Sequence, residues 1–258
     1  HESLSRKEKM KPLILVTNDD GFDSPGIMTL RSELSRIGDV WVVAPHTEQS
    51  AISRAITLWD PLRLHDHGDQ VYSVTGTPTD SVYVALHNLL PRRPDICVSG
   101  LNKGANLGDD VLYSGTVAGA SEATQMGIPA IAMSLTSYRS LEFDVAAHFA
   151  HKMTEIVLER GLPRDVLLNV NVPLSADKKT PIRVGKLGRR RYEERVVNCQ
   201  DPRERPYFWI GGRQLGHDDM PGSDCNLNSE GYVTVTPVKL DMTDYGFMQE
   251  VSEWVSAE

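Results

Sequence analysis

The sequence has few cysteines and lacks long apolar runs. Its three cysteines, Cys97, Cys199 and Cys225, are odd in number and too widely spaced to form paired metal-ligand motifs. Separate, reduced thiols are typical of cytoplasmic proteins, so we expect a cytoplasmic location. No apolar stretch approaches the roughly 20 residues that a membrane-spanning helix needs, so we expect no membrane partner.

Positive charge is also scarce. The chain carries 27 Lys and Arg against 35 Asp and Glu, a formal net charge of −8. Proteins that bind duplex nucleic acid by neutralising its phosphates need the opposite balance, so we expect no nucleic acid duplex as a partner. The basic run Arg189-Arg190-Arg191 is accordingly predicted to be a solvated or interface segment. A small anionic substrate is still compatible, because a bound cation can reverse the local field.

The start of the chain lacks the apolar core of a signal sequence. The first nine residues are mostly polar and charged, and we expect Met10 to be the natural start. The remaining composition, with 40% hydrophobic and 24% charged residues, is that of a globular protein. A length of 258 residues allows one large domain or two.

Strand and helix signals alternate over the first two thirds of the chain. The predicted strands cover residues 13–17, 40–44, 95–99, 128–134 and 166–170, and the predicted helices cover residues 25–37, 78–90, 117–126 and 143–160. Such alternation indicates an α/β fold with a doubly wound, mostly parallel sheet in three layers, as in Rossmann-like proteins.

The pattern changes beyond Pro173. Short apolar runs at residues 182–187, 207–210 and 232–236 are more typical of hairpin strands than of βα units, and a closing helix is predicted near residues 245–255. We therefore predict a metal- and phosphate-binding core at residues 10–175. A β-hairpin-rich extension at residues 176–258, used for oligomerisation, would complete one continuous domain.

Two adjacent carboxylates follow the first predicted strand. Asn18-Asp19-Asp20-Gly21 stands directly after the strand, and open α/β sheets bind ligands at that end of their strands. Paired carboxylates with hydroxyl and amide oxygens nearby suit Mg²⁺ or Mn²⁺ better than zinc. We predict that Asp19 and Asp20 hold one such ion and that one of them acts as the catalytic base. Asn18 is expected to contact the substrate or to orient a carboxylate.

A Gly- and Asn-rich loop follows the third predicted strand. It contains Asn102, Gly104 and Asn106, and a helix start follows at Ser114-Gly115-Thr116. Glycines let backbone N–H groups approach a ligand, and a helix start offers free amides to a phosphate. We therefore predict that these loop and helix-start residues bind substrate phosphate for monoester hydrolysis. The plainer alternative is that they are turn residues and helix caps.

Several motifs occur in an order that resembles the survival protein SurE family of metal-dependent nucleotidases, from about Met10 onward. The motifs that carry the resemblance are Thr17-Asn18-Asp19-Asp20-Gly21, Val42-Val43-Ala44-Pro45 through Ser50, Gly76-Thr77-Pro78-Thr79-Asp80, Val98-Ser99-Gly100-Leu101-Asn102, Tyr113-Ser114-Gly115-Thr116-Val117 and Glu230-Gly231-Tyr232-Val233. Several motifs in one order are far more specific than any single motif.

The resemblance implies a complete ligand set for one divalent metal ion, Mg²⁺ or Mn²⁺, per subunit. The four implied ligands are Asp19, Asp20, Ser50 and Asn102. It also implies hydrolysis of nucleoside 5′- and 3′-monophosphates, sometimes of short polyphosphate. The implied assembly is a dimer or tetramer joined through exchanged C-terminal segments.

Two positions differ from the pattern common in the family, and two other functions compete with the nucleotidase. His46 stands where Asp is common, and Arg54 stands where His or Asn is frequent. Neither is a ligand position.

The competing functions are a broad acid phosphatase with weak base recognition and a metal-dependent nucleotide sensor that binds without turnover.

Overall fold

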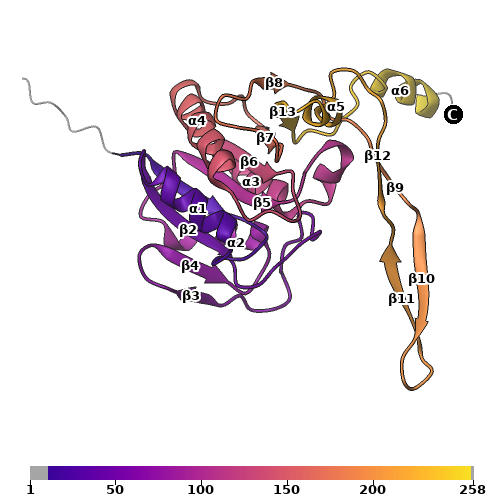
Figure 1. The fold of residues 1–258 in the computed structure, drawn as a ribbon, viewed down its shortest axis with the longest axis horizontal. Helices are drawn as coiled ribbons and strands as arrows, with labels where there is room; N and C mark the ends of the chain where they lie inside the picture. Colours follow the sequence, from indigo (N-terminus) through magenta and orange to yellow (C-terminus); the bar gives the residue numbers. More distant parts are fainter. Residues whose placement is uncertain (1–10, 257–258) are drawn as a thin grey trace, which may run out of the picture.

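The computed structural model describes residues 11–256, so the expectation for Met10 lies outside the described residues. Its centre is a nine-stranded sheet in the order β3-β4-β2-β1-β5-β6-β7-β13-β8 (Figure 1). These strands are β1 (Leu13–Thr17), β2 (Asp39–Pro45), β3 (Leu64–Asp66), β4 (Val71–Val74), β5 (Ile96–Lys103), β6 (Ala130–Leu135), β7 (Val166–Val172), β8 (Ile182–Val184) and β13 (Val233–Lys239). Only the pairs β3/β4 and β7/β13 of this sheet are antiparallel. The predicted mostly parallel α/β class is confirmed.

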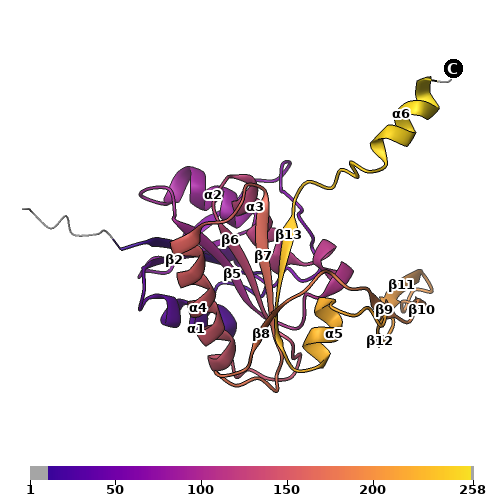
Figure 2. The same ribbon diagram turned by 90° about the horizontal axis from the view of Figure 1, so that it is seen from above.

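Helices cover both faces of the sheet and make the three predicted layers (Figure 2). One face carries α1 (Pro25–Leu34) and α4 (Asp144–Arg160), and the other carries α2 (Pro78–Val84), its π-helical continuation η1 (Ala85–Leu89) and α3 (Gly115–Gln125). Apolar side chains at helical spacing on each helix pack against strand side chains in two separate buried clusters. The helix nearest the site, α3, is almost wholly buried and is rich in Gly, Ala, Ser and Thr, which let it lie close to the sheet.

The order of the strands reverses at β1. The chain passes from β1 to its neighbour β2 on one side, and later crosses to β5 on the other side of β1. The connections on either side of such a point diverge and leave a crevice at the carboxyl ends of the two central strands. The residues that follow β1 and end β5 therefore meet at the place where this fold binds ligands.

Strand β5 is longer than the sequence predicts. It continues to Lys103 beside β6, with an irregularity between Ser99 and Asn102, whereas we predicted a loop from Gly100 onward. Glycine and Asn signal a turn in isolation, but β6 supplies backbone partners that extend the strand. As a result, Asn102 lies on the end of a strand.

The part of the chain after residue 175 both completes the sheet and leaves it. β8 and β13 join the central sheet, so the prediction of hairpin strands at residues 182–187 and 232–236 is wrong. Residues 207–210 do lie in a hairpin, formed by β10 (Arg195–Gln200) and β11 (Pro206–Gly211). We call this hairpin the arm, and its root is the pair β9 (Arg190–Tyr192) and β12 (Gln214–His217).

The arm projects away from the sheet in Figure 1, and the last helix, α6 (Met248–Ser256), extends from the body in Figure 2. Between the arm and β13 lies the short helix α5 (Asp224–Ser229). Within residues 11–256, the helices are all too short or too polar to cross a bilayer. The boundary predicted at residue 175 stays a prediction.

Candidate functional site

Asp19 is a buried carboxylate at the centre of the candidate site. Only 5% of its surface is exposed, and the Thr116 hydroxyl donates a hydrogen bond of 2.7 Å to its Oδ1. Burial is the main reason why the pKa of Asp19 is raised to about 7; the Thr116 hydrogen bond acts in the opposite direction, and the charge of Asp20 adds to the rise. In the described part of the chain no cationic side chain pairs with Asp19.

The start of α3 lies against Asp19 because residue 115 is glycine. A Cβ placed on Gly115 would stand 2.6 Å from the Asp19 Cβ and 2.9 Å from its Oδ2, closer than carbon atoms pack. Ser114 caps the helix by accepting a hydrogen bond of 3.0 Å from the Val117 N–H. Thr116 also lowers the pKa of Asp19 through its backbone amide. The positive end of the helix thus faces the carboxylate.

Asp20 is less buried and lies between the two neighbouring loops. The Lys103 N–H donates to its Oδ2 at 3.3 Å, which ties it to the end of β5. Burial is the first cause that raises the pKa of Asp20, and the charge of Glu48 also raises it, while the hydrogen bond and charge of Lys103 lower it. Glu48 is a carboxylate near the site that the sequence analysis missed, although it stands two residues before Ser50.

The loop after β2 is bound to the loop after β1. The Gln49 N–H donates to the Asp19 carbonyl at 2.7 Å, and the Phe22 N–H donates to the Pro45 carbonyl at 3.0 Å. Ser50 lies in this loop, is exposed, and its hydroxyl donates to Glu48 at 2.7 Å. The residues predicted as ligands from the first two strands are therefore carried by loops in direct contact.

Asn102 completes the predicted ligand set from β5. Its amide nitrogen donates to the Gly104 carbonyl at 2.9 Å, which fixes the orientation of the side chain. Among the described residues no donor binds the Asn102 amide oxygen, so that oxygen is free to accept a ligand. The segments that follow β1 and β2 and the end of β5 thus bring oxygen donors together at the carboxyl ends of these strands.

Gly104 and Asn106 are held inside the protein. The Gly104 N–H donates to the Leu135 carbonyl at 2.9 Å, and the Asn106 amide nitrogen donates to the Ser134 hydroxyl at 2.8 Å. Asn171 binds both the N–H and the carbonyl of Asn106 at 2.9 Å. These groups support the loop, and the predicted contact of the two residues with substrate stays a prediction.

Asn18 also serves the loop in which it lies. It is fully buried, and its amide nitrogen donates to the Gly21 carbonyl and to the Ser24 hydroxyl, both at 2.9 Å. These bonds shape the turn that presents Asp19 and Asp20. The Asn18 amide oxygen has no protein partner among the described residues.

The two positions that depart from the family pattern lie beside this site. The His46 Nδ1 lies 3.0 Å from the Ser73 hydroxyl, and its ring stacks near Phe22, with centroids 5.7 Å apart. Arg54 pairs with the buried carboxylate of Glu122 on α3 at 3.0 Å. Neither residue occupies a predicted ligand position.

The donor set fits a hard divalent cation. Asp19 is a buried carboxylate without a cationic partner, and a bound cation would stabilise its charged form. The additional donors, Asp20, Ser50 and Asn102, all offer oxygen, which such a cation prefers. The described residues contain no group of three or more His, Cys, Asp and Glu side chains arranged for metal binding, so the candidate set depends on its Asn and Ser members.

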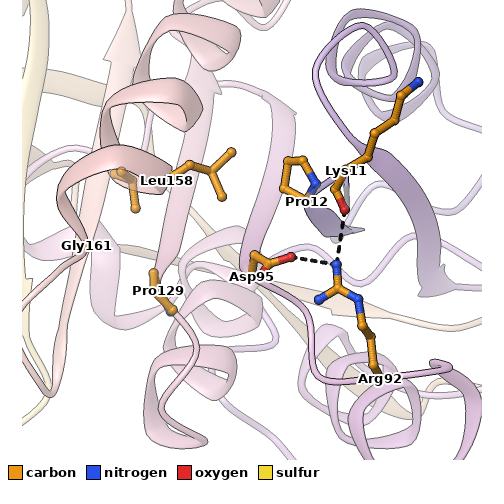
Figure 3. Close-up of a pocket in the computed structure, with 8 residues that line it drawn as sticks. Lys11, Pro12, Arg92, Asp95, Pro129, Leu158 and Gly161 are labelled. Atoms are coloured by element: carbon orange, nitrogen blue, oxygen red, sulfur yellow. Dashed lines mark hydrogen bonds and ion pairs between the residues drawn. The ribbon is translucent and has the colours of Figure 1, made fainter. Parts of the chain in front are cut away.

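A pocket of about 630 Å³ lies at the other side of the sheet from the candidate site, at the amino-terminal ends of the strands (Figure 3). It is lined by residues that precede strands, including Pro12, Asp95 and Pro129, and Arg92 bridges the Asp95 carboxylate at 2.9 Å and the Lys11 carbonyl at 3.2 Å. Open α/β sheets bind their ligands at the carboxyl ends of the strands, so this pocket lies outside the candidate site.

The chain matches known proteins over nearly its whole length. The family model described as survival protein SurE matches residues 14–194. Proteins named 5′-nucleotidase SurE from Pelobacter propionicus and Geobacter metallireducens are each 50% identical, over 94% and 95% of this chain and 99% and 98% of their own lengths. The crystal structure of the SurE protein from Aquifex aeolicus is 38% identical with a TM-score of 0.84, covering 94% of this chain and 99% of that one. The chain belongs to the SurE family.

Proposed function

We propose that the chain is a divalent-metal-dependent nucleotidase that removes phosphate from nucleoside 5′- and 3′-monophosphates, with short polyphosphate as a further substrate. The observation that carries the proposal is the buried, unpaired Asp19 at the point where the strand order reverses, facing a helix start. The names of the similar proteins, 5′-nucleotidase SurE, support the same activity.

Asp19, Asp20, Ser50 and Asn102 would hold one Mg²⁺ or Mn²⁺ ion. When bound, the ion would polarise the phosphoryl oxygens and lower the pKa of a water molecule. The Thr116 hydroxyl orients Asp19, and Lys103 orients Asp20 through its backbone. These supporting contacts keep the two carboxylates in place when the cation is absent.

The residues of α3 would bind the substrate phosphate. The Gly115 amide belongs to the first turn of the helix, where N–H groups lack intrahelical partners. The amide and hydroxyl of Thr116 face Asp19 and would place Thr116 beside the phosphate, next to Ser114. Water attacks phosphorus, the bond to the ribose oxygen breaks, and the nucleoside leaves with a proton. One of the two aspartates takes the proton of the attacking water and passes it to the leaving ribose oxygen; we assign this role to Asp20, because it is the less buried.

A sensor that binds nucleotide without turnover and a broad acid phosphatase are the alternatives. Phosphate release from a chromogenic monoester with Mn²⁺, repeated with a chelator, separates the enzyme from the sensor. A panel of nucleotides and simple monoesters separates the nucleotidase from the acid phosphatase. Preference for nucleoside monophosphates over simple monoesters is the result that we expect.

Self-association and a cytoplasmic location belong to the same proposal. The arm and α6 expose large apolar side chains, such as Trp209, Ile210 and Trp254, which are 65%, 94% and 57% exposed. Apolar surface of this extent marks interfaces, so we propose a dimer or tetramer formed through the C-terminal segments. All three cysteines are unpaired, which supports a reducing environment.

The test of the proposed site is Asp20→Asn, with Asp23→Asn as its matched control. Asp23 is an exposed carboxylate in the same loop and lies outside the donor set. We expect Asp20→Asn to lower the turnover of AMP by at least about 100-fold and to remove the increase in melting temperature on adding Mn²⁺. Asp23→Asn should keep both. Unchanged metal-dependent hydrolysis in Asp20→Asn would mean that the site is wrongly assigned.

A further inference from the structure

The loop between β5 and α3 joins the candidate site to the root of the arm. It contains a 3-10 helix, η2 (Gly108–Leu112), and ends at Ser114, the cap of the helix that we propose binds phosphate. One side of η2 therefore leads directly into the site. The other side contacts residues more than 75 positions later in the sequence.

The contacts on that side form a cluster that we call the clamp: Asp109, Asp110, Arg190 and Tyr192. The Arg190 N–H donates to the Asp109 Oδ1 at 2.9 Å, and the Tyr192 hydroxyl donates to the Asp110 Oδ2 at 2.6 Å. The Arg190 Nε lies 3.4 Å from the same Asp110 oxygen. Two residues of the arm root thus hold two consecutive residues of η2.

Arg190 is the buried member of the clamp. Its side chain is 4% exposed, whereas its neighbour Arg191 in the same strand is 59% exposed and pairs with Asp218 at 3.5 Å. Arg190 is therefore not solvated, and that form of the prediction for this run is wrong. A buried guanidinium needs a charged partner, and Asp110 is the carboxylate that supplies it.

Asp224 strengthens the junction from α5. Its two carboxylate oxygens accept hydrogen bonds from the Gly108 N–H at 2.9 Å and the Gly188 N–H at 2.8 Å, so one buried side chain binds η2 and the segment before the arm together. The backbones touch as well, because a Cβ on Gly108 would lie 2.8 Å from the Gly188 carbonyl.

From η2 the contacts continue into two loops of the site. The Tyr113 N–H donates to the Asp110 carbonyl at 3.0 Å, and Ser114 follows directly. Ser53 donates its N–H to the Tyr113 carbonyl at 3.0 Å and its hydroxyl to the Leu112 carbonyl at 2.7 Å, which attaches the loop that carries Ser50. A displacement of η2 would therefore move both the helix start and the Ser50 loop.

We propose that Arg190 and Tyr192 are positioning residues for the reaction: through Asp109 and Asp110 they set the position of η2, and thereby of the phosphate-binding start of α3. The inference rests on the proposed nucleotidase function. Neither residue touches the reacting atoms. Asp19 follows directly after β1, and Asp20 is bound to the end of β5 through Lys103, so the clamp acts mainly on the helix start and the Ser50 loop.

The test compares Arg190→Gln with Arg191→Gln, the exposed arginine next to it. Arg190→Gln keeps the backbone bond to Asp109 but leaves the Asp110 charge without its cation. We expect the KM for AMP to rise about tenfold in Arg190→Gln, while Mn²⁺ affinity, measured by direct titration, falls by a smaller factor, because only Ser50 of the four proposed ligands lies in a loop attached to η2. Arg191→Gln should match the wild type in both.

Tyr192→Phe tests the clamp without removing a charge. Tyr192 is 45% exposed, and the substitution deletes only the hydroxyl that binds Asp110. It should raise the KM for AMP about threefold. This variant decides the matter if Arg190→Gln does not fold. A purely structural role would lower the melting temperature and the active fraction but leave the KM of the active fraction unchanged, and that result would overturn the proposal.

The wild type and Arg191→Gln show whether a failure concerns the proposed nucleotidase function or only the positioning role of the clamp. If both hydrolyse AMP and the Arg190 and Tyr192 variants do so with an unchanged KM, the clamp is wrong and the nucleotidase stands. If the wild type neither hydrolyses AMP nor binds it in calorimetry with Mn²⁺, the proposed function fails and the clamp fails with it.

Discussion

Asp19 occupies its position through a contact that only glycine permits. The first turn of α3 reaches the carboxylate because Gly115 has no side chain, and Thr116 then binds the carboxylate directly. The start of α3 therefore binds Asp19 and can also bind an anion. A cation bound to Asp19 would lower its pKa again, against the burial that raises it to about 7.

Gly115→Ala tests this close approach. The added Cβ would stand 2.6 Å from the Asp19 Cβ, so either the helix start or the carboxylate must move by roughly 1 Å. We expect kcat/KM for AMP to fall about 100-fold, because displacements of this size in a catalytic site have such effects. Gly211→Ala, where a Cβ meets nothing closer than 3.9 Å, is the matched control in steady-state assays. Full activity in Gly115→Ala would show that α3 does not position Asp19.

For single residues, the sequence predicts which residue types lie at the candidate site but not the hydrogen-bond partner of each one. Adjacent carboxylates after a strand are most often a solvated turn or a helix start, so Asp19 and Asp20 were predictable only together with Asn102, the Gly-rich loop and the other motifs of the family. The roles of Gly104 and Asn106 were not, because their partners Leu135, Ser134 and Asn171 are distant in sequence. Glu48 was missed because an exposed loop carboxylate has no distinguishing pattern.

Among the elements, the loop between β5 and α3 depends on a buried amide network. Asn171 in β7 binds the N–H and the carbonyl of Asn106, and Asn169 donates to the same carbonyl at 2.7 Å. Two polar side chains inside a sheet need such partners, because an unpaired buried amide destabilises the fold. The loop is thus anchored at one end by β7 and at the other by the arm root.

Asn171→Ala removes the first of these anchors. It leaves the Asn106 N–H buried without a partner and should lower the free energy of unfolding by about 2 kcal/mol, measured by urea denaturation. It should also raise the KM for AMP, since the loop leads to Ser114. Asn198→Ala, an exposed Asn on β10, is the control and should change neither quantity. A stable variant with a normal KM would contradict the anchoring role.

The elements that sequence patterns placed well are the ones with a regular apolar repeat. The helices α1, α3 and α4 and the strands β1, β2, β6 and β7 follow local signals of apolar pattern, caps and terminal glycines. β13 did not, because its place depends on antiparallel pairing with β7, more than 60 residues earlier. β5 was predicted too short for the same reason, since its last residues pair only with β6.

On the scale of the whole molecule, the two segments that leave the body, the arm and α6, both expose large apolar side chains. The arm exposes Phe208, Trp209 and Ile210 in one strand, and α6 exposes Trp254 and Val255. A lone two-stranded hairpin is marginally stable in water, and these side chains bury little area against their own subunit. Association with a second copy would cover both segments and stabilise the arm whose root holds η2.

Trp209→Lys combined with Ile210→Lys tests whether the arm mediates assembly. These side chains are 65% and 94% exposed in one subunit, so lysine costs little in the folded monomer but places charge in an apolar interface. We expect light scattering to show a dimer or tetramer for the wild type and a smaller species for the double variant. Leu141→Lys, a 59% exposed leucine in the loop before α4, is the control and should assemble as the wild type does. An unchanged mass in the double variant would mean that assembly, where it occurs, uses another surface, and α6 would be the segment to change next.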